Sequence, residues 1–323
     1  MVVLDGASLT IDSLAAVAEG GDEVVLAPAA RDRMAAAREI VEEALRSEAA
    51  VYGLTTALAE RKSVVLDAGA RQGFSRFLIR GHLIAQGPPA PPPVVRAAMA
   101  CLVNGFAKGV AGVRPELAEM MVGALNGGLV PAVRRLGSVG QADLGPMADL
   151  AEGLLNETGF VLADNEGLAL VNNNAFATGW AALAELATER LLGEAEVAAA
   201  LDLEAFAGNL SILHPVVTEV RPHPGTAATI GRLRALLAGS SLSEPGSARN
   251  LQDPLTFRSI PQILGAARDA LRYTRGTIET ELNSAGCNPA VVLAERRIVS
   301  VGNLDIVPVA AALDFARIAL ARW

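Results

Sequence analysis

Hydrophobic residues recur with a helical period along most of the chain. Apolar side chains return every three or four residues from Pro28 to about Ser47 and again from Gln262 to Leu282. Such spacing places them on one stripe of an α-helix, and that stripe has to pack against other helices. From Gly179 to about Leu203 the apolar residues cover two faces, which is typical of a helix inside a bundle. The pattern predicts long helices and a mainly α fold.

Signals for β-strands are few and short. Val24–Leu26 indicates one strand, and Val291–Leu293 and Ile298–Val301 flank a polar turn that predicts a hairpin. We predict an N-terminal, loop-rich domain over residues 1–165, which carries the active site, and a central helical-bundle domain over residues 166–323. The last residues, ALDFARIALARW, have the pattern of an apolar helix that ends without a cap.

The composition narrows the class of protein. Apolar residues make up 51% and charged residues 19%, which excludes a disordered chain and indicates apolar surface buried between subunits. Lys and Arg together number 27 against 35 Asp and Glu, giving a net charge of −8, so we expect no nucleic-acid partner. Because no apolar stretch is long enough to span a membrane, we expect a cytoplasmic protein without a membrane partner.

The usual nucleotide, metal and hydrolase motifs are absent from the sequence. No P-loop, dinucleotide-binding, zinc-protease or nucleophile-elbow pattern occurs. Cys101 and Cys287 stand far apart and lack the Cys or His spacing of a zinc site, so we expect two buried thiols in a reducing compartment. We expect neither a metal nor a cofactor.

A few polar residues in mostly apolar surroundings are candidates for chemistry. Tyr52 lies in a turn-like stretch, VYGLTT; because a phenol has a pKa of about 10, it acts as a base near neutral pH only beside positive charge. Arg258, just before a helix, can supply that charge or bind a substrate carboxylate through two hydrogen bonds. His82 precedes a proline-rich loop, and Asn172–Asn174 interrupt an apolar run, where buried amides need partners in the protein or in a ligand. A purely structural role is the alternative for each.

Nine segments, in order, resemble the histidine and aromatic amino-acid ammonia-lyases and aminomutases. Together they extend over nearly the whole chain, and their common order is far more specific than any one of them. The resemblance implies a mainly α fold, a tetramer with a multi-helix core, and active sites shared between subunits. The segments are VYGLTT (51–56), RFLIRGHLIAQG (76–87), LN followed by P and GSVG (125–140), DLGPMA (143–148), EGLALVN (166–172), RPHPG (221–225), QDPLTFRSIPQ (252–262), ELNSAGCNP (281–289) and SVGNLDIVPVA (300–310).

The resemblance also implies roles for single residues. Tyr52 matches the family's essential loop tyrosine, Asn172 an asparagine near substrate and prosthetic group, and Arg258 the arginine that binds the substrate carboxylate. His82 matches the pocket position that contacts the substrate side chain, and Gln252 a nearby amide. This set of residues can remove a proton and hold a carboxylate.

The chain departs from the family in three ways. Family members form an electrophilic methylideneimidazolone from an Ala-Ser-Gly between GSVG and DL, where this chain has only Gln141 and Ala142, a degenerate loop. Two positions that we expect to bind substrate carry different residues: Leu255 replaces the family's tyrosine after QDP, and Leu304 replaces its phenylalanine after GN. Family chains also continue past the point where this sequence stops, adding core helices. We therefore expect no methylideneimidazolone.

Two functions remain open from the sequence. The first is a lyase, not an ordinary ammonia-lyase, in which Tyr52 removes a proton and a good leaving group departs from a small carboxylate-bearing substrate; isomerisation or cyclisation would use the same base. The second is a non-catalytic structural subunit. The retention of Tyr52, Asn172 and Arg258 favours the enzyme. We expect a homo-oligomer, or a hetero-oligomer with a second chain that completes the helical bundle.

Overall fold

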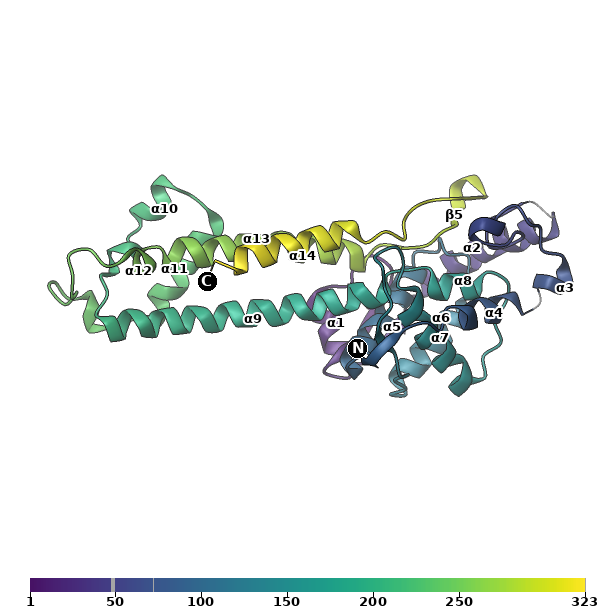
Figure 1. Cartoon of the computed structure of the whole chain (residues 1–323), viewed down its shortest axis with the longest axis horizontal. Helices are drawn as coiled ribbons and strands as arrows, with labels where there is room; N and C mark the ends of the chain where they lie inside the picture. Colours follow the sequence, from purple (N-terminus) through teal and green to yellow (C-terminus); the bar gives the residue numbers. More distant parts are fainter. Residues whose placement is uncertain (48–49, 72, 323) are drawn as a thin grey trace. The chain divides into compact units, whose positions relative to one another are not determined.

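The computed structural model describes residues 1–47, 50–71 and 73–322 and confirms a mainly α fold (Figure 1). The chain divides into two compact units: unit 1 comprises Met1–Leu183 and Ile278–Val309, and unit 2 comprises Ala184–Thr277 and Ala310–Trp323. Three helices have residues in both units, namely α9 (Ala175–Phe206), α13 (Ile260–Leu282) and α14 (Val307–Leu320). The boundary expected between residues 165 and 166 stays a prediction.

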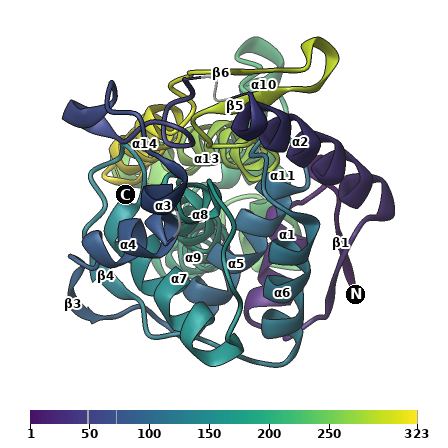
Figure 2. The same ribbon diagram turned by 90° about the vertical axis from the view of Figure 1, so that its right-hand side faces the viewer.

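Unit 1 has a helical core. Its helices are α1 (Ile11–Ala18), α2 (Pro28–Arg46), α3 (Ala68–Arg71), α4 (Phe74–Gly81), α5 (Pro92–Phe106), α6 (Pro115–Asn126), α7 (Leu144–Thr158) and α8 (Glu166–Val171). Nearly every residue of α5 is buried, and this helix packs against α1 and α6 (Figure 2). α7 packs against α4, α6 and α8. A helix that is apolar all round belongs at the centre of a core, which is where α5 lies.

The strands form short pairs within unit 1. β1 (Val2–Leu4) pairs in parallel with β2 (Val24–Leu26), β3 (Gln86–Pro89) pairs antiparallel with β4 (Arg134–Leu136), and β5 (Ala290–Val292) pairs antiparallel with β6 (Arg297–Val299). The predicted strand Val24–Leu26 is β2, and the predicted hairpin is the β5–β6 pair, so both predictions are confirmed.

Proline marks the start of several helices. Pro28, Pro92, Pro115 and Pro224 occupy the first turn of α2, α5, α6 and α11 (Pro224–Leu236). A first-turn proline is tolerated because its missing N–H would have no partner within the helix. The last two residues of the proline-rich segment Gly87–Pro93 accordingly begin α5.

Unit 2 is held by apolar packing and by ion pairs between α9 and α13. Its other helices are α10 (Val216–Val220), α11 and α12 (Leu255–Arg258). Leu203 and Leu233 are fully buried in its core. The buried Glu196 pairs with Arg268 at 2.5 Å, and Arg275 lies 2.9 Å from Glu189. Although α9 has 32 residues, no described helix is long and apolar enough to cross a membrane.

One buried carboxylate fixes the start of α8 in unit 1. Glu166 is fully buried, and its Oε1 accepts hydrogen bonds from the backbone N–H of Arg114 at 3.0 Å and from Arg114 Nε at 2.8 Å. Its Oε2 accepts from Arg114 Nη2 at 2.7 Å and from the backbone N–H of Ala163 at 2.8 Å. Four donors on one carboxylate replace its lost hydration, so the first turn of α8 has a single stable position.

We expect Glu166→Gln to lower the free energy of unfolding by about 2–4 kcal/mol, because the buried amide accepts fewer hydrogen bonds and leaves Arg114 without its counter-charge. Urea denaturation of the purified chain measures this difference. The control is Glu43→Gln, which breaks an exposed ion pair with Arg296 and should change stability by no more than about 1 kcal/mol. Equal effects of the two substitutions would contradict the assignment.

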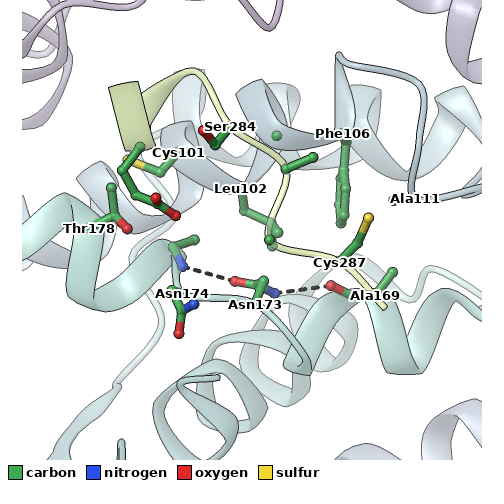
Figure 3. A pocket seen from close by; sticks show the side chains of 15 residues that line it. Cys101, Leu102, Phe106, Ala111, Ala169, Asn173, Asn174, Thr178, Ser284 and Cys287 are labelled. Carbon is green, nitrogen blue, oxygen red and sulfur yellow. Dashed lines mark hydrogen bonds between the residues drawn. The ribbon is translucent and has the colours of Figure 1, made fainter. Parts of the chain in front are cut away.

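A small cavity lies in the core of unit 1, where α5, α9 and the end of α13 meet. Its volume of about 40 Å³ has room for a few water molecules. Cys101 and Cys287 line different sides of it (Figure 3), together with Thr178, Glu281 and Ser284. Burial raises the pKa of Glu281, and burial together with the Glu281 charge raises the pKa of Cys101. Burial also raises the pKa of Cys287 to about 11, so both thiols stay protonated at neutral pH.

Glu281 makes the stability of unit 1 depend on pH. Its folded pKa lies above the unfolded value, so the folded state prefers the neutral acid, and stability falls as the pH rises from the unfolded to the folded pKa. We expect Glu281→Gln to match the wild type in unfolding free energy below pH 4 and to exceed it at pH 7. Chemical denaturation at both pH values tests this, with the exposed Glu60→Gln as control. A variant less stable than the wild type at pH 7 would refute the argument.

Candidate active site

The turn that carries Tyr52 rests directly on α8. Three backbone N–H groups, those of Leu54, Thr55 and Thr56, donate to the Val51 carbonyl at 3.0–3.1 Å. The Tyr52 hydroxyl accepts from the backbone N–H of Ala59 at 3.3 Å, and the ring is half-buried.

Glycine is required at position 53 of this turn. Gly53 has a φ of +69°, a conformation that disfavours side chains. A Cβ there would lie 2.4 Å from Leu168 Cδ2 of α8, which is closer than van der Waals contact permits. The backbone of the turn therefore lies directly against the Leu168 side chain of α8.

Asn172 ends α8 and begins the asparagine trio. Its backbone N–H donates to the Leu168 carbonyl at 2.8 Å, and its Nδ2 donates to the Asn288 carbonyl at 3.2 Å. Asn173 Nδ2 donates to the carbonyls of Ala169 and Leu170, and its Oδ1 accepts from the backbone N–H of Ala175 (Figure 3).

Asn174 completes the trio and reaches a different segment. Its Nδ2 donates to the Leu304 carbonyl at 2.7 Å, while its buried Oδ1 has no hydrogen-bond partner. The protein itself thus provides partners for most of the polar atoms of the three amides.

The loop before α7 is bound tightly to the asparagine trio and to the segment around Leu304. Ala142, fully buried at φ +69°, donates its N–H to the Leu304 carbonyl at 2.9 Å. The N–H of Asp143 donates to the Asn173 carbonyl at 2.8 Å, and Gln141 forms an isolated β-bridge with Asp305. Unit 1 therefore brings together the predicted loop and Leu304, with Asn172 at the start of the trio.

Asp143 is the charged residue of this loop. It is fully buried, and its Oδ1 accepts from Ser138 Oγ at 2.5 Å while its Oδ2 accepts from the backbone N–H of Ala177 at 2.7 Å. Burial raises the pKa of the Asp143 carboxyl, and these hydrogen bonds oppose that change. The contacts fix the loop to the first turn of α9.

The residues present do not fit a methylideneimidazolone. That group needs three consecutive residues with a central serine, whereas Gly140 and Asp143 are separated only by Gln141 and Ala142. Neither side chain carries a hydroxyl, and the Ala142 N–H is already engaged with Leu304. We assign no chemical step to such a group in this loop.

His82 follows α4 at its C-terminal end. Its Nδ1 lies 2.8 Å from the Leu78 carbonyl, which can only accept, so Nδ1 carries the hydrogen. In the neutral ring Nε2 is then the free acceptor. α4 packs against α8, which brings the elements carrying His82 and Asn172 side by side.

The structure places the remaining predicted residues in unit 2. Arg258 ends α12, and its exposed guanidinium has no ion pair or hydrogen bond to another described residue. Gln252 is exposed, and Leu255 is 68% exposed. The buried Asp253 anchors this segment by accepting from the backbone N–H of Asn209 at 2.6 Å. Gln252, Leu255 and Arg258 thus lie in one unit, whereas Tyr52, His82, Asn172 and Leu304 lie in the other.

Sequence reasoning missed Asp143, Ser138 and Glu281. The sequence held a partial signal for Glu281, which follows Ile278 by three residues and so continues the apolar stripe of α13. No comparable signal marks Asp143 as buried. Among the residues that the structure describes, no group of three or more His, Cys, Asp or Glu is arranged to hold a metal.

Comparisons with known proteins agree over nearly the whole chain. The family model "Aromatic amino acid lyase" matches residues 9–161 and 156–323. Histidine ammonia-lyase of Caldanaerobacter subterraneus subsp. tengcongensis is 34% identical over 341 residues, covering 99% of this chain and 67% of that protein. Histidine ammonia-lyase of Anaeromyxobacter sp. (strain K) is 36% identical over 351 residues, and the match covers 98% of this chain and 69% of that protein. The chain therefore spans about two thirds of these relatives.

A solved structure confirms the expected fold. The ergothionase of Treponema denticola, in complex with desmethyl-ergothioneine sulfonic acid, superposes with a TM-score of 0.94. Its sequence is 25% identical, and the match covers 99% of this chain and 69% of that one. The prediction of an ammonia-lyase-type helical fold is thereby confirmed.

The comparisons overturn the function expected from the sequence. We predicted a lyase that is not an ordinary ammonia-lyase, or a structural subunit, because of the two-residue loop at Gln141 and Ala142. Relatives named histidine ammonia-lyase match 98–99% of the chain, and they point to ammonia-lyase activity instead. The prediction was wrong because it rested on one short loop, whereas the similarity to these relatives extends along the whole chain. The chain belongs to the aromatic amino acid lyase family.

Proposed function

We propose that the protein is a carbon–nitrogen lyase of the histidine ammonia-lyase type, which eliminates the amino group from histidine or a closely related imidazole amino acid. The observation that carries this proposal is the 34–36% identity to histidine ammonia-lyases over 98–99% of the chain. The elimination converts histidine into an imidazole-substituted acrylate and ammonium. One C–H bond and one C–N bond break, and the C–H electron pair becomes the new C=C bond.

Tyr52 is the proposed base. Its oxygen takes the proton from the carbon next to the imidazole ring, and its only hydrogen-bond partner among the described residues is the Ala59 N–H, at a long 3.3 Å. The oxygen thus keeps a lone pair for substrate. Asn172 ends α8, whose Leu168 contacts the Tyr52 turn at Gly53, and we propose that the Asn172 amide orients the substrate.

Arg258 is the proposed carboxylate-binding residue. Its guanidinium is exposed and uncommitted, so both nitrogens of its fork remain available for two parallel hydrogen bonds. Gln252 and Leu255 accompany it on the same segment, while His82 and Leu304 are proposed to contact the substrate from unit 1.

We propose that a second chain completes the site. Arg258 and Tyr52 belong to different units, and the loop at Gln141–Ala142 supplies no serine for leaving-group activation. A second copy, or a polypeptide corresponding to the remaining third of the relatives, would bring further groups to the substrate. The high apolar content of the chain supports buried contacts between subunits.

We expect the protein, with its completing chain where one is needed, to release ammonia from L-histidine and to form a product with near-ultraviolet absorbance. Tyr52→Phe should lower kcat about 10²–10⁴-fold with KM nearly unchanged, because it removes only the proton-accepting oxygen. Tyr273→Phe is the matched control, since the only other tyrosine lies exposed on α13. Full turnover by Tyr52→Phe, or turnover of a trimethylammonium analogue but not of histidine, would contradict the proposal.

Arg258→Lys should raise KM for histidine about tenfold with a smaller effect on kcat, because lysine keeps the charge but loses the second hydrogen bond. Steady-state kinetics separates the two parameters. Arg221→Lys, at another exposed arginine of unit 2, is the control and should leave both unchanged. If KM stays constant in Arg258→Lys, the carboxylate binds elsewhere.

A further inference from the structure

Three arginines surround a pocket of unit 1 that lies outside the proposed active site. The pocket has a volume of about 490 Å³. Arg71 of α3, Arg76 and Arg80 of α4, Leu155 of α7 and the segment 159–164 are among the residues that line it. The lining therefore combines three cationic side chains with apolar ones, which include Phe160 and Leu162.

The cations of this pocket are only partly neutralised. Glu152, whose side chain is 16% exposed, forms ion pairs with two of the three arginines. Its carboxylate lies 2.9 Å from Arg76 Nε and 3.3 Å from Arg80 Nε. The Arg71 side chain has no ion pair or hydrogen bond to another described residue, whereas its backbone N–H donates to the Asp67 carbonyl at 2.9 Å. Asp164 is the one carboxylate among the described lining residues, so three positive charges face two negative ones.

Many arginine donors remain unused. Arg76 Nη2 donates to Asn156 Oδ1, which leaves its Nη1 free. Its buried Nε makes no well-directed hydrogen bond even to Glu152. Both terminal nitrogens of Arg80 and the whole fork of Arg71 likewise have no acceptor among the described residues. Guanidinium nitrogens without acceptors, gathered in one hollow, favour an anion that can accept several hydrogen bonds at once.

The N-terminal end of α4 also favours an anion in this pocket. Gly73, at φ +82°, precedes α4 and provides no side-chain cap for its first turn. The Ser75 hydroxyl donates to the Ala163 carbonyl at 2.9 Å and does not cap this end of the helix. Gly73 and Ser75 both line the pocket, so the uncapped N-terminal end of α4 meets the arginines there.

We propose that this pocket binds a phosphate group, with the arginine forks as its main ligands and the apolar wall available to an attached organic part. Phosphate offers three or four acceptor oxygens, which match the unused arginine donors, and its negative charge is opposite in sign to the single excess positive charge. α4 continues from this pocket to His82 and packs against α8, so a bound phosphate would act on the elements that carry His82 and Asn172.

Calorimetric titration of the full chain with inorganic phosphate, at constant ionic strength in chloride, tests the proposal. We expect saturable binding that Arg71→Gln weakens at least about tenfold. This substitution breaks no ion pair, so folding should survive. Arg135→Gln, at an exposed arginine of β4 that does not line this pocket, is the matched control and should bind phosphate as the wild type does.

Absence of saturable phosphate binding by the wild type, or equal affinity of Arg71→Gln and wild type, would overturn the proposal. Loss of binding in Arg135→Gln would overturn it too, because it would show a general effect of net charge. Titration with phenyl phosphate separates the two sources of the ligand. Tighter binding than inorganic phosphate identifies an organic ester that uses the apolar wall, and equal binding identifies free phosphate.

Discussion

The buried carboxylate of Asp143 holds the candidate site in unit 1 together. Moving an ionised carboxylate out of water costs several kcal/mol unless hydrogen bonds replace the hydration. Ser138 Oγ and the Ala177 N–H supply those bonds, and the second ties the loop to the first turn of α9, where the helix dipole favours negative charge. Because Asp143 is fixed, the adjacent backbone meets Asn173 and Leu304 in one arrangement.

Close backbone approach is the second constraint on this region. A Cβ on Gly167 would lie 2.3 Å from the Ser75 carbonyl oxygen, so α8 and α4 can pack this closely only with glycine at that position. Gly53 plays the same part between the Tyr52 turn and Leu168 of α8. α8 and α4 therefore meet backbone to backbone at Gly167, and the Tyr52 turn meets the Leu168 side chain of α8 at Gly53. Their relative positions depend on two glycines that touch no substrate.

The sequence predicted regular elements far better than loops. The apolar stripes indicated α2 and α13 to within two residues at each end, because periodicity records directly which face of a helix is buried. It could not show that Asp143 is buried or that Glu281 faces a cavity, since both depend on segments more than thirty residues away. The family resemblance supplied the candidate residues.

The anchoring of the Arg258 segment bears on how the site is completed. Asp253 is almost fully buried and binds the Asn209 backbone and the Asn250 side chain, while Gln252, Leu255 and Arg258 around it remain exposed. The Arg258 side chain forms no ion pair or hydrogen bond with another described residue, and the Leu255 side chain is 68% exposed, so the two add little to the stability of the described part of this chain. These exposed side chains are available to a molecule outside this chain. The proposed role of Arg258 depends on this exposure, because a guanidinium already committed within the chain could not form two hydrogen bonds to a substrate carboxylate.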